Sequence, residues 1–301
     1  MKEIIITGAS GFVGKNLVEY LRELNCLPVG ISLRSGKIPD LPGSAEALVH
    51  LAGKAHDVKG VEDAEIYFAV NTDLTIRLFD EFLNSTIPVF IFLSSVKASA
   101  DSVNGLLTEE DQPYPVTAYG QSKWEAERYI LNRNIPSDKR IFILRPCMIH
   151  GPGNKGNLNL LYKIVKWGIP YPLASFENQR SFLSVENLCF VIKELIDRTD
   201  IPSGVYNVSD DSALSTNRVI EIMYETIMKR PRLLKINKRF INSTARIGDF
   251  LPLPLNSERL QKLTESYVVS NAKLIDAIKK PLPVGSEEGL RKTIYSFCGG
   301  K

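Results

Sequence analysis

Three glycines spaced three residues apart stand close to the start of the chain. Gly8, Gly11 and Gly14 follow an apolar run over residues 1–6, and a helical pattern over residues 15–24 comes directly after them. Glycine lets the backbone turn tightly and approach a bound phosphate, and a helix start offers free N–H groups and a positive dipole end. The order of strand, glycine turn and helix predicts a site for the pyrophosphate of a dinucleotide, with an ordinary glycine turn as the alternative.

Composition and charge favour a globular protein without a nucleic-acid or membrane partner. The chain has 301 residues, of which 44% are hydrophobic and 24% charged, and its net charge is +3. No apolar run reaches about 18 residues, and the chain enters its first strand without a leader. The four cysteines have neither metal-ligand nor redox spacing, so we expect no metal site. These features together predict a cytoplasmic protein with reduced thiols.

Strand and helix patterns alternate over the first half of the chain. After the first strand, further strands are expected over residues 27–33, 47–52, 89–94 and 141–145, and helices over 11–24, 62–84 and 117–133. This alternation predicts an α/β fold, namely a Rossmann-type, doubly wound parallel sheet with helices on both faces.

The pattern changes after the turn at residues 151–153. Helices are expected near residues 157–167, 184–198 and 215–229, and a late strand over 204–208. We therefore predict a dinucleotide-binding domain over residues 1–152. Residues 153–301 then form mainly a smaller α/β substrate-binding lobe, interleaved with the end of the sheet.

A tyrosine and a lysine four residues apart begin the helix expected over residues 117–133. Tyr119 and Lys123 share one face of that helix. A free phenol has a pKa near 10, and a neighbouring ammonium lowers it. Such a phenol can exchange a proton with a sugar hydroxyl while a hydride moves to or from nicotinamide. Taken alone, the pair also fits an ordinary helix surface.

Two serines end the strand expected over residues 89–94. At the carboxyl edge of the sheet, the hydroxyl of Ser94 or Ser95 can orient a substrate oxygen, although a strand-end cap is the simpler interpretation. Further motifs follow the same order along the chain: 7–14, 50–53, Asn71, Arg145-Pro146 and 150–153. With them, the chain resembles the extended short-chain dehydrogenases of the NAD-dependent epimerase/dehydratase family, which act on nucleotide sugars. The resemblance extends to residues 285–293, which are similar to that family's last helix.

The resemblance implies roles for individual residues. Tyr119 would be the catalytic acid and base, Lys123 would tune it and hold the nicotinamide ribose, and Ser95, or else Ser94, would be the catalytic serine. Cofactor-binding positions would be Gly8, Ser10, Gly11, Phe12, Val13, Gly14, Ser32, Arg34, Asp40, Leu51, Ala52, Gly53, Asn71, Tyr119, Lys123 and Pro146.

The chain departs from the family pattern around its second strand. Relatives that prefer NAD end this strand with a carboxylate that binds the ribose hydroxyls, whereas this chain has Ser32, followed by Arg34. These residues suit a 2′-phosphate, so NADP(H) is favoured over NAD(H), with Arg34 as a merely solvated loop residue as the equal alternative. The next family strand is shortened to residues 36–43, which form either a short strand that brings Asp40 to the adenine or an open loop.

The resemblance also implies a substrate side. Substrate-binding positions would be Ser94, Ser95, Val96, Lys97, Asn157, Arg180 and Arg259. Arg180 stands where relatives contact the nucleotide diphosphate, and a guanidinium suits phosphate oxygens. Asn157 is equally understandable as a helix cap, and the alignment at Arg259 is loose. His56 and His150 are better explained as core or loop histidines than as catalytic ones.

Three functions remain open at this point. Residues 94–97 and 119–127 are most similar to UDP-sugar 4-epimerases and UDP-4-keto-sugar reductases of surface-polysaccharide assembly. The missing carboxylate favours exchangeable NADPH, and hence reduction of a UDP-4-keto-6-deoxy-N-acetylhexosamine over 4-epimerisation of a UDP-hexose with tightly bound NAD. A non-catalytic dinucleotide-binding protein is the remote alternative, because both Tyr119 and Lys123 are present. We expect a homodimer, with the seam formed by helices 62–84 and 117–133.

Overall fold

The centre of the molecule is one parallel sheet of six strands. The computed structural model describes residues 1–54, 64–154, 156–250 and 256–299. The strands pair in the order β2-β1-β3-β4-β6-β9, all parallel. Their bounds are β1 Glu3–Thr7, β2 Leu27–Ile31, β3 Ala47–His50, β4 Val89–Leu93, β6 Arg140–Pro146 and β9 Gly204–Val208. This arrangement confirms the predicted doubly wound fold.

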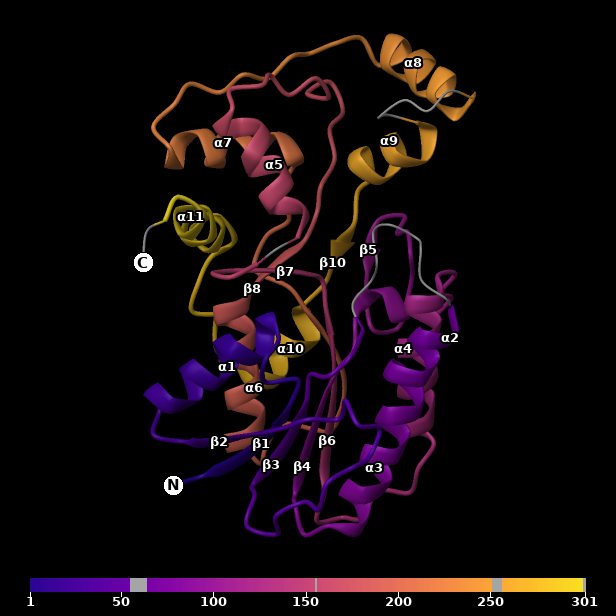
Figure 1. Cartoon of the computed structure of the whole chain (residues 1–301), viewed down its shortest axis with the longest axis vertical. Helices are drawn as coiled ribbons and strands as arrows, with labels where there is room; N and C mark the ends of the chain where they lie inside the picture. Colours follow the sequence, from indigo (N-terminus) through magenta and orange to yellow (C-terminus); the bar gives the residue numbers. More distant parts are fainter. Residues whose placement is uncertain (55–63, 155, 251–255, 300–301) are drawn as a thin grey trace.

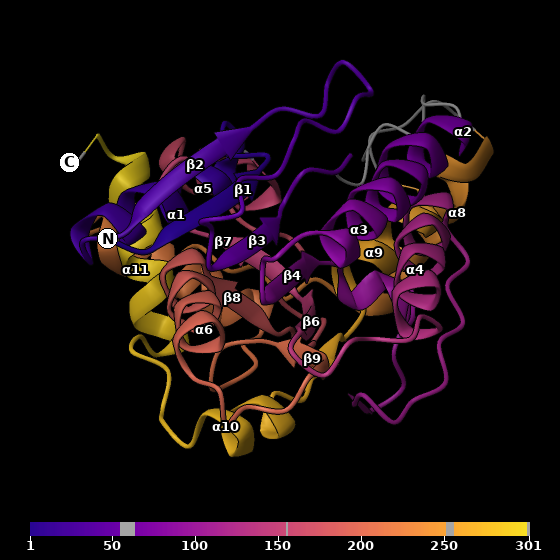
Figure 2. The same cartoon turned by 90° about the horizontal axis from the view of Figure 1, so that it is seen from below.

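Helices cover both faces of this sheet (Figures 1 and 2). Helices α1 (Phe12–Glu23) and α6 (Val185–Asp197) lie on one face, and α3 (Leu74–Asn84) and α4 (Ala118–Leu131) lie on the other. Successive side chains of a strand point to opposite faces, so Ile4 and Ile6 join the core under α1 and α6. Ile5 joins the core under α3.

The helix expected over residues 62–84 contains a π-helical segment. Within the described residues it runs as α2 (Ala64–Tyr67), a π-helix η1 (Phe68–Asp73) and α3, without a break between them. A wider turn of this kind is frequent at functional sites, and here it carries Asn71.

The second half of the chain builds a lobe above the carboxyl edge of the sheet (Figure 1). Its core lies among α5 (Asn157–Lys166), α7 (Thr216–Thr226) and α11 (Ser286–Phe297). The sequence patterns did not predict helices α8 (Lys238–Phe250), α9 (Ser257–Thr264) and α10 (Ala272–Ile278). The short strands are β5 Leu106–Leu107, β7 Met148–His150, β8 Phe182–Ser184 and β10 Val268–Val269, and residues Val96–Ala98 form a 3-10 turn.

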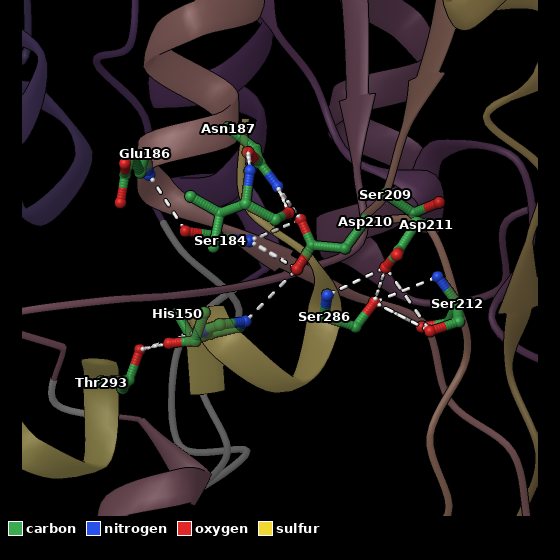
Figure 3. A network of polar contacts seen from close by, with 12 residues as sticks. His150, Ser184, Glu186, Asn187, Ser209, Asp210, Asp211, Ser212, Ser286 and Thr293 are labelled. Atoms are coloured by element: carbon green, nitrogen blue, oxygen red, sulfur yellow. Dashed lines mark hydrogen bonds and ion pairs between the residues drawn. The ribbon is translucent and has the colours of Figure 1, made fainter. Parts of the chain in front are cut away.

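A buried polar network joins the lobe to the sheet (Figure 3). Asp210, just after β9, accepts hydrogen bonds from the Ser184 backbone N–H at 3.0 Å and from the Asn187 amide at 2.7 Å. Its carboxylate lies 3.6 Å from His150 Nε2, while His150 Nδ1 bonds to Thr293 of α11 at 2.8 Å. The histidine therefore connects strands and a distant helix, in agreement with the structural role expected for it. His56 lies outside the described residues.

The sheet ends at β2, because residues 34–46 contain no strand. Of the two alternatives for residues 36–43, the structure shows the open loop. No helix in the described part of the chain is long and apolar enough to cross a membrane.

Candidate functional site

The glycine turn between β1 and α1 forms a tight cradle. Gly8 has a φ of +71°, and a Cβ added there would lie 2.7 Å from the Ala52 backbone nitrogen. A Cβ on Gly14 would lie 2.3 Å from the Gly8 carbonyl oxygen. Only glycine fits both positions, and α1 directs its N-terminus towards this turn. The cradle therefore fits a dinucleotide pyrophosphate.

Three adjoining cavities run along the carboxyl edge of the sheet. The first, of about 800 Å³, lies between the glycine turn, the end of β2 and α3. The second, of about 400 Å³, shares Gly8 and Gly53 with it and reaches Tyr119 and Lys123. The third, of about 260 Å³, shares Ser95 and Tyr119 with the second and extends into the lobe. The row has the order needed by the adenosine half of a dinucleotide, its nicotinamide half and a sugar. We therefore call the three the adenosine, nicotinamide and sugar cavities.

Most of the cofactor-binding positions expected from the sequence line the first two cavities. They are Gly8, Ser10, Gly11, Phe12, Val13, Gly14, Ser32, Arg34, Leu51, Ala52, Gly53, Tyr119, Lys123 and Pro146. Asp40 is exposed on the loop after β2 and is not among the residues that line the adenosine cavity, so its contact with adenine stays a prediction that this geometry does not support. The loop leaves it there because no strand carries it back along the sheet.

Asn71 lies behind the cavities instead of lining them. It is fully buried in η1, its Oδ1 accepts from the Lys54 N–H at 2.7 Å, and its Nδ2 donates to Ser122 Oγ at 3.1 Å. The amide therefore fixes the segment after β3 against α4. Its predicted contact with the cofactor becomes a positioning role.

The phenol of Tyr119 is hydrogen-bonded to Ser95, and both residues line the second and third cavities. Burial raises the pKa of Tyr119 above its ordinary value of 10, and the Ser95 hydrogen bond only partly offsets this. The expected lowering of this pKa by Lys123 is thus not seen in the protein by itself. At neutral pH the phenol is protonated and can donate.

Lys123 is held deep in the second cavity, 5% exposed. Its Nζ donates to the Leu93 carbonyl at 2.9 Å and lies 4.8 Å from the centre of the Phe92 ring. Burial lowers the pKa of Lys123 to about 8, while the Glu127 carboxylate acts in the opposite direction. The ammonium is therefore still mostly charged at neutral pH.

The two serines after β4 have different partners. Ser95 bonds to Tyr119, whereas the Ser94 hydroxyl donates to the buried Glu127 carboxylate. Glu127 also accepts a bidentate contact from Arg145, with Nη2 2.6 Å from Oε2 and Nε 3.1 Å from Oε1. The geometry thus favours Ser95 as the serine of the site. Arg145 belongs to a motif named from the sequence, whereas its buried partner Glu127 was not singled out.

His50 is a neutral part of the scaffold. Its ring bonds to Thr7 at 2.6 Å and to Thr75 at 2.8 Å. Burial, together with the nearby Lys123 charge, lowers the pKa of His50 to about 3. Thr7 Oγ1 in turn accepts from the Ala52 N–H at 3.0 Å, so the histidine couples β1, β3 and α3 behind the cofactor cavities.

Two arginines border the adenosine cavity. Arg34 follows β2, and Arg77 comes from α3, where its Nη1 donates to the Gly36 carbonyl at 2.8 Å. Ser32 is exposed beside them, and no carboxylate belongs to the described lining of this cavity. Arg77 was not expected from the sequence, because its helix is far along the chain from the loop that it contacts.

The third cavity has two cations that were expected from the sequence, and Tyr267 and Glu265, which were not. Lys97 and Arg180 line it, together with Val96, Tyr267 and Glu265. Lys97 Nζ lies 4.4 Å from the centre of the Tyr267 ring, and Arg180 Nη2 lies 3.6 Å from the Glu265 carboxylate. Burial lowers the pKa of both cations, and Glu265 opposes this shift.

The described residues that line this cavity do not include Arg259 or Asn157. Arg259 is exposed on α9 and does not line any of the three cavities, so its substrate contact stays a prediction that this geometry does not support. Its helix α9 was not foreseen from the sequence. Asn157 is the first residue of α5, and its side chain lies outside the described part of the chain. Among the described residues, no group of histidine, cysteine or acidic side chains is arranged to hold a metal.

Comparisons with known proteins agree with this geometry. A model of the NAD dependent epimerase/dehydratase family matches residues 4–209. The chain is 33% identical over 242 residues to a UDP-glucose 4-epimerase of Vibrio cholerae, covering 73% of this chain and 74% of that protein. It is 24% identical over 273 residues to a UDP-2-acetamido-2,6-beta-L-arabino-hexul-4-ose reductase of Pseudomonas aeruginosa, covering 87% and 65%.

The fold also matches solved structures over its whole length. MoeE5 in complex with UDP-glucose and NAD superposes with a TM-score of 0.77 at 21% identity, covering 99% of each chain. The family match over more than half of the chain agrees with the resemblance stated from the motifs. The chain therefore belongs to the NAD-dependent epimerase/dehydratase family and is a nucleotide-sugar enzyme of the epimerase and reductase type.

Proposed function

We propose that this enzyme uses NADPH to reduce the 4-keto group of a UDP-4-keto-6-deoxy-N-acetylhexosamine. The observation that carries the proposal is the adenosine cavity, where Arg34 and Arg77 stand and the described lining has no carboxylate. A carboxylate would repel a 2′-phosphate, whereas two guanidinium groups attract it and bond to its oxygens. A dinucleotide held in this cavity, beside the open loop after β2, would exchange after each turnover, as a reductase requires.

The catalytic residues support the reductive direction. The bound dinucleotide supplies the hydride, and the chain must supply the proton. Tyr119 is protonated at neutral pH because burial raises its pKa, so its hydroxyl can donate to the developing alkoxide at carbon 4. Ser95 orients the same oxygen, and Lys123 provides the positive charge that stabilises the phenolate left behind.

The third cavity suits the diphosphate side of the substrate. Lys97 and Arg180 are cations at its wall, and Tyr267 offers an aromatic face next to them. Because burial disfavours their charged forms, an anionic ligand that approaches them gains more than it would at an exposed site. A nucleoside diphosphate sugar fits this cavity with its diphosphate at the two cations and its sugar directed towards Tyr119.

Cofactor preference provides the first test. Arg34→Ala and Arg77→Ala are each expected to weaken NADPH binding by about tenfold, since each removes one charge-assisted contact to the 2′-phosphate. The affinity for NADH should remain within about twofold of the original protein. Dissociation constants from fluorescence titration with both dinucleotides measure this directly. Tighter binding of NADH than NADPH, with no effect of either substitution, would contradict the proposal.

Epimerisation of a UDP-hexose at carbon 4 is the second candidate function. The 33% identity to the Vibrio cholerae UDP-glucose 4-epimerase favours it. An epimerase of this kind keeps its NAD through the cycle, so mass spectrometry of the nucleotides that co-purify separates the two candidates. One tightly held NAD per chain, with interconversion of UDP-hexoses without added cofactor, would establish the epimerase. Consumption of NADPH by a UDP-4-keto sugar would establish the reductase.

A further inference from the structure

The tip of the substrate lobe carries a strong excess of positive charge. We define this basic tip as residues 156–169, which include α5, and residues 227–250, which include α8. The first segment has two lysines and no acidic residue, and the second has seven lysines and arginines and one acidic residue. All nine cations are exposed, and none of them forms an ion pair with a described residue. The net charge of +3 for the whole chain conceals this asymmetry.

The two segments form one continuous surface. Lys229 Nζ donates to the Lys166 carbonyl at 3.3 Å, and Arg232 Nη1 donates to the Gly168 carbonyl at 3.1 Å. Tyr171 pairs with Leu233 in a short bridge that continues this junction. Figure 1 shows α5, α8 and the connection between α7 and α8 at the end of the molecule opposite the amino terminus. This surface is therefore remote from the sheet and from the cofactor cavities.

Large apolar side chains are exposed on the same surface. Met228 is 94% exposed and Trp167 is 72% exposed. In the sequence, Met228 precedes Lys229 and Arg230, and Trp167 follows Lys166. On α8, Phe250 is 89% exposed, Phe240 64% and Ile247 52%. Exposed aromatic side chains next to basic ones are the composition of a surface that lies in the interface of a bilayer.

Helix α8 has two apolar faces. Ile241, Ala245 and Gly248 are buried against the rest of the lobe. At about 100° per residue, Phe240, Ile247 and Phe250 fall within about 80° of one another on the opposite side of the helix. Arg239 and Arg246 adjoin this outer face, both on the side of Phe250. Packing within the chain explains the inner face and leaves the outer one without a partner among the described residues.

A basic cavity of about 390 Å³ opens in the same surface. It is lined by Trp167, Tyr224, Lys229, Arg230 and Arg232. The Tyr224 side chain is 1% exposed, and its hydroxyl has no hydrogen-bond partner among the described residues. Three cations around an unsatisfied buried hydroxyl offer the contacts that a lipid phosphate group requires.

We propose that the basic tip docks the enzyme on an anionic lipid bilayer. The outer face of α8 and Trp167 would enter the interface, and the nine cations would contact the phosphate groups of the lipids. Self-association through this surface is disfavoured, because a second copy would bring like charges together. The docked enzyme would lie on the membrane without spanning it.

Vesicle flotation with the full chain tests this inference. Vesicles of phosphatidylcholine alone are compared with vesicles that also contain phosphatidylglycerol, at low and at high salt. We expect the chain to float only with the anionic vesicles, and high salt to release it, because the attraction falls off within a Debye length. Binding should shift the tryptophan emission to shorter wavelength, and Trp167→Phe should abolish that shift.

Paired variants separate docking from a general effect of charge. Arg239→Glu combined with Arg246→Glu should lower the partition coefficient by about tenfold or more, since each exposed cation contributes separately. The matched control is Arg22→Glu with Arg128→Glu, which makes the same charge change at exposed positions of α1 and α4 and should leave flotation unchanged. Phe240→Ser with Ile247→Ser should also weaken flotation, without any change of charge.

Four results would overturn the proposal. They are no flotation, equal flotation with neutral vesicles, equal loss in the control pair, and a dimer in gel filtration that the α8 variants dissociate. Urea unfolding midpoints that match those of the original chain show that each variant is folded. None of these readouts depends on the sugar or the cofactor that the enzyme uses.

Discussion

Substitution of Tyr119 by phenylalanine is expected to lower kcat by about two to four orders of magnitude, the usual contribution of a positioned general acid or base. The change removes one hydroxyl, which hydrogen-bonds to Ser95 at the junction of the nicotinamide and sugar cavities. The aromatic ring, and with it the edge contact to Tyr67 at 6.1 Å, is retained. Steady-state oxidation of NADPH with a panel of UDP-4-keto sugars measures the effect.

Tyr114→Phe is the matched control for this experiment. Tyr114 is 81% exposed and lies outside the described lining of the three cavities, so its loss should leave kcat unchanged. Dinucleotide affinity should be similar in both variants, because the phenol of Tyr119 acts on the substrate and not on the pyrophosphate cradle. If Tyr119→Phe kept more than about a tenth of the original kcat on every substrate turned over, the assigned proton donor would be wrong.

Removal of the Glu127 charge is expected to produce the largest loss of stability. Glu127→Gln leaves the Arg145 guanidinium, which is 3% exposed, without a counter-charge, and breaking a buried pair in this way costs about 3–5 kcal/mol. The unfolding midpoint in urea should fall accordingly. Glu125→Gln, on an exposed position of the same helix, should change the midpoint very little.

A double variant shows whether the uncompensated charge is the cause. Glu127→Met combined with Arg145→Met removes both charges and should recover much of the stability that Glu127→Gln loses. A double variant as unstable as the single one would mean that packing or the Ser94 hydrogen bond, and not the charge, dominates. Because Glu127 also raises the pKa of Lys123, its loss should leave a smaller charged fraction of this lysine at neutral pH.

The features that are local in sequence were predictable. The glycine cradle depends on the conformation of a few consecutive residues, and Tyr119 and Lys123 need only one helix turn to share a face. The order of strands and helices through β6 follows from alternating apolar patterns. For the same reason the strand end at Ser94 and Ser95 was placed correctly, but the choice between these serines required their partners, Glu127 and Tyr119.

The features that depend on distant contacts were not predictable. Arg77 reaches the adenosine cavity only because α3 packs beside the loop that follows β2. Glu265 and Tyr267 come to the sugar cavity across some eighty residues of chain, and α8 and α9 lie where the pattern gave no signal. Asp40 and Arg259 were assigned by family position alone; Asp40 lies on a loop without a strand, and Arg259 lies on α9, which no sequence pattern predicted.

The shortened segment after β2 also has a consequence for aggregation. It leaves β2 as a free edge of the parallel sheet, where another chain can add a strand. The Leu27 N–H donates inward to Lys2 at 2.8 Å, so in the alternating pattern of the ladder the next residue, Pro28, faces outward. Proline has no N–H to offer to an incoming strand. Pro28 thus removes one of the outward N–H groups of this edge, and any residue with an N–H at position 28 would offer one more to an incoming strand.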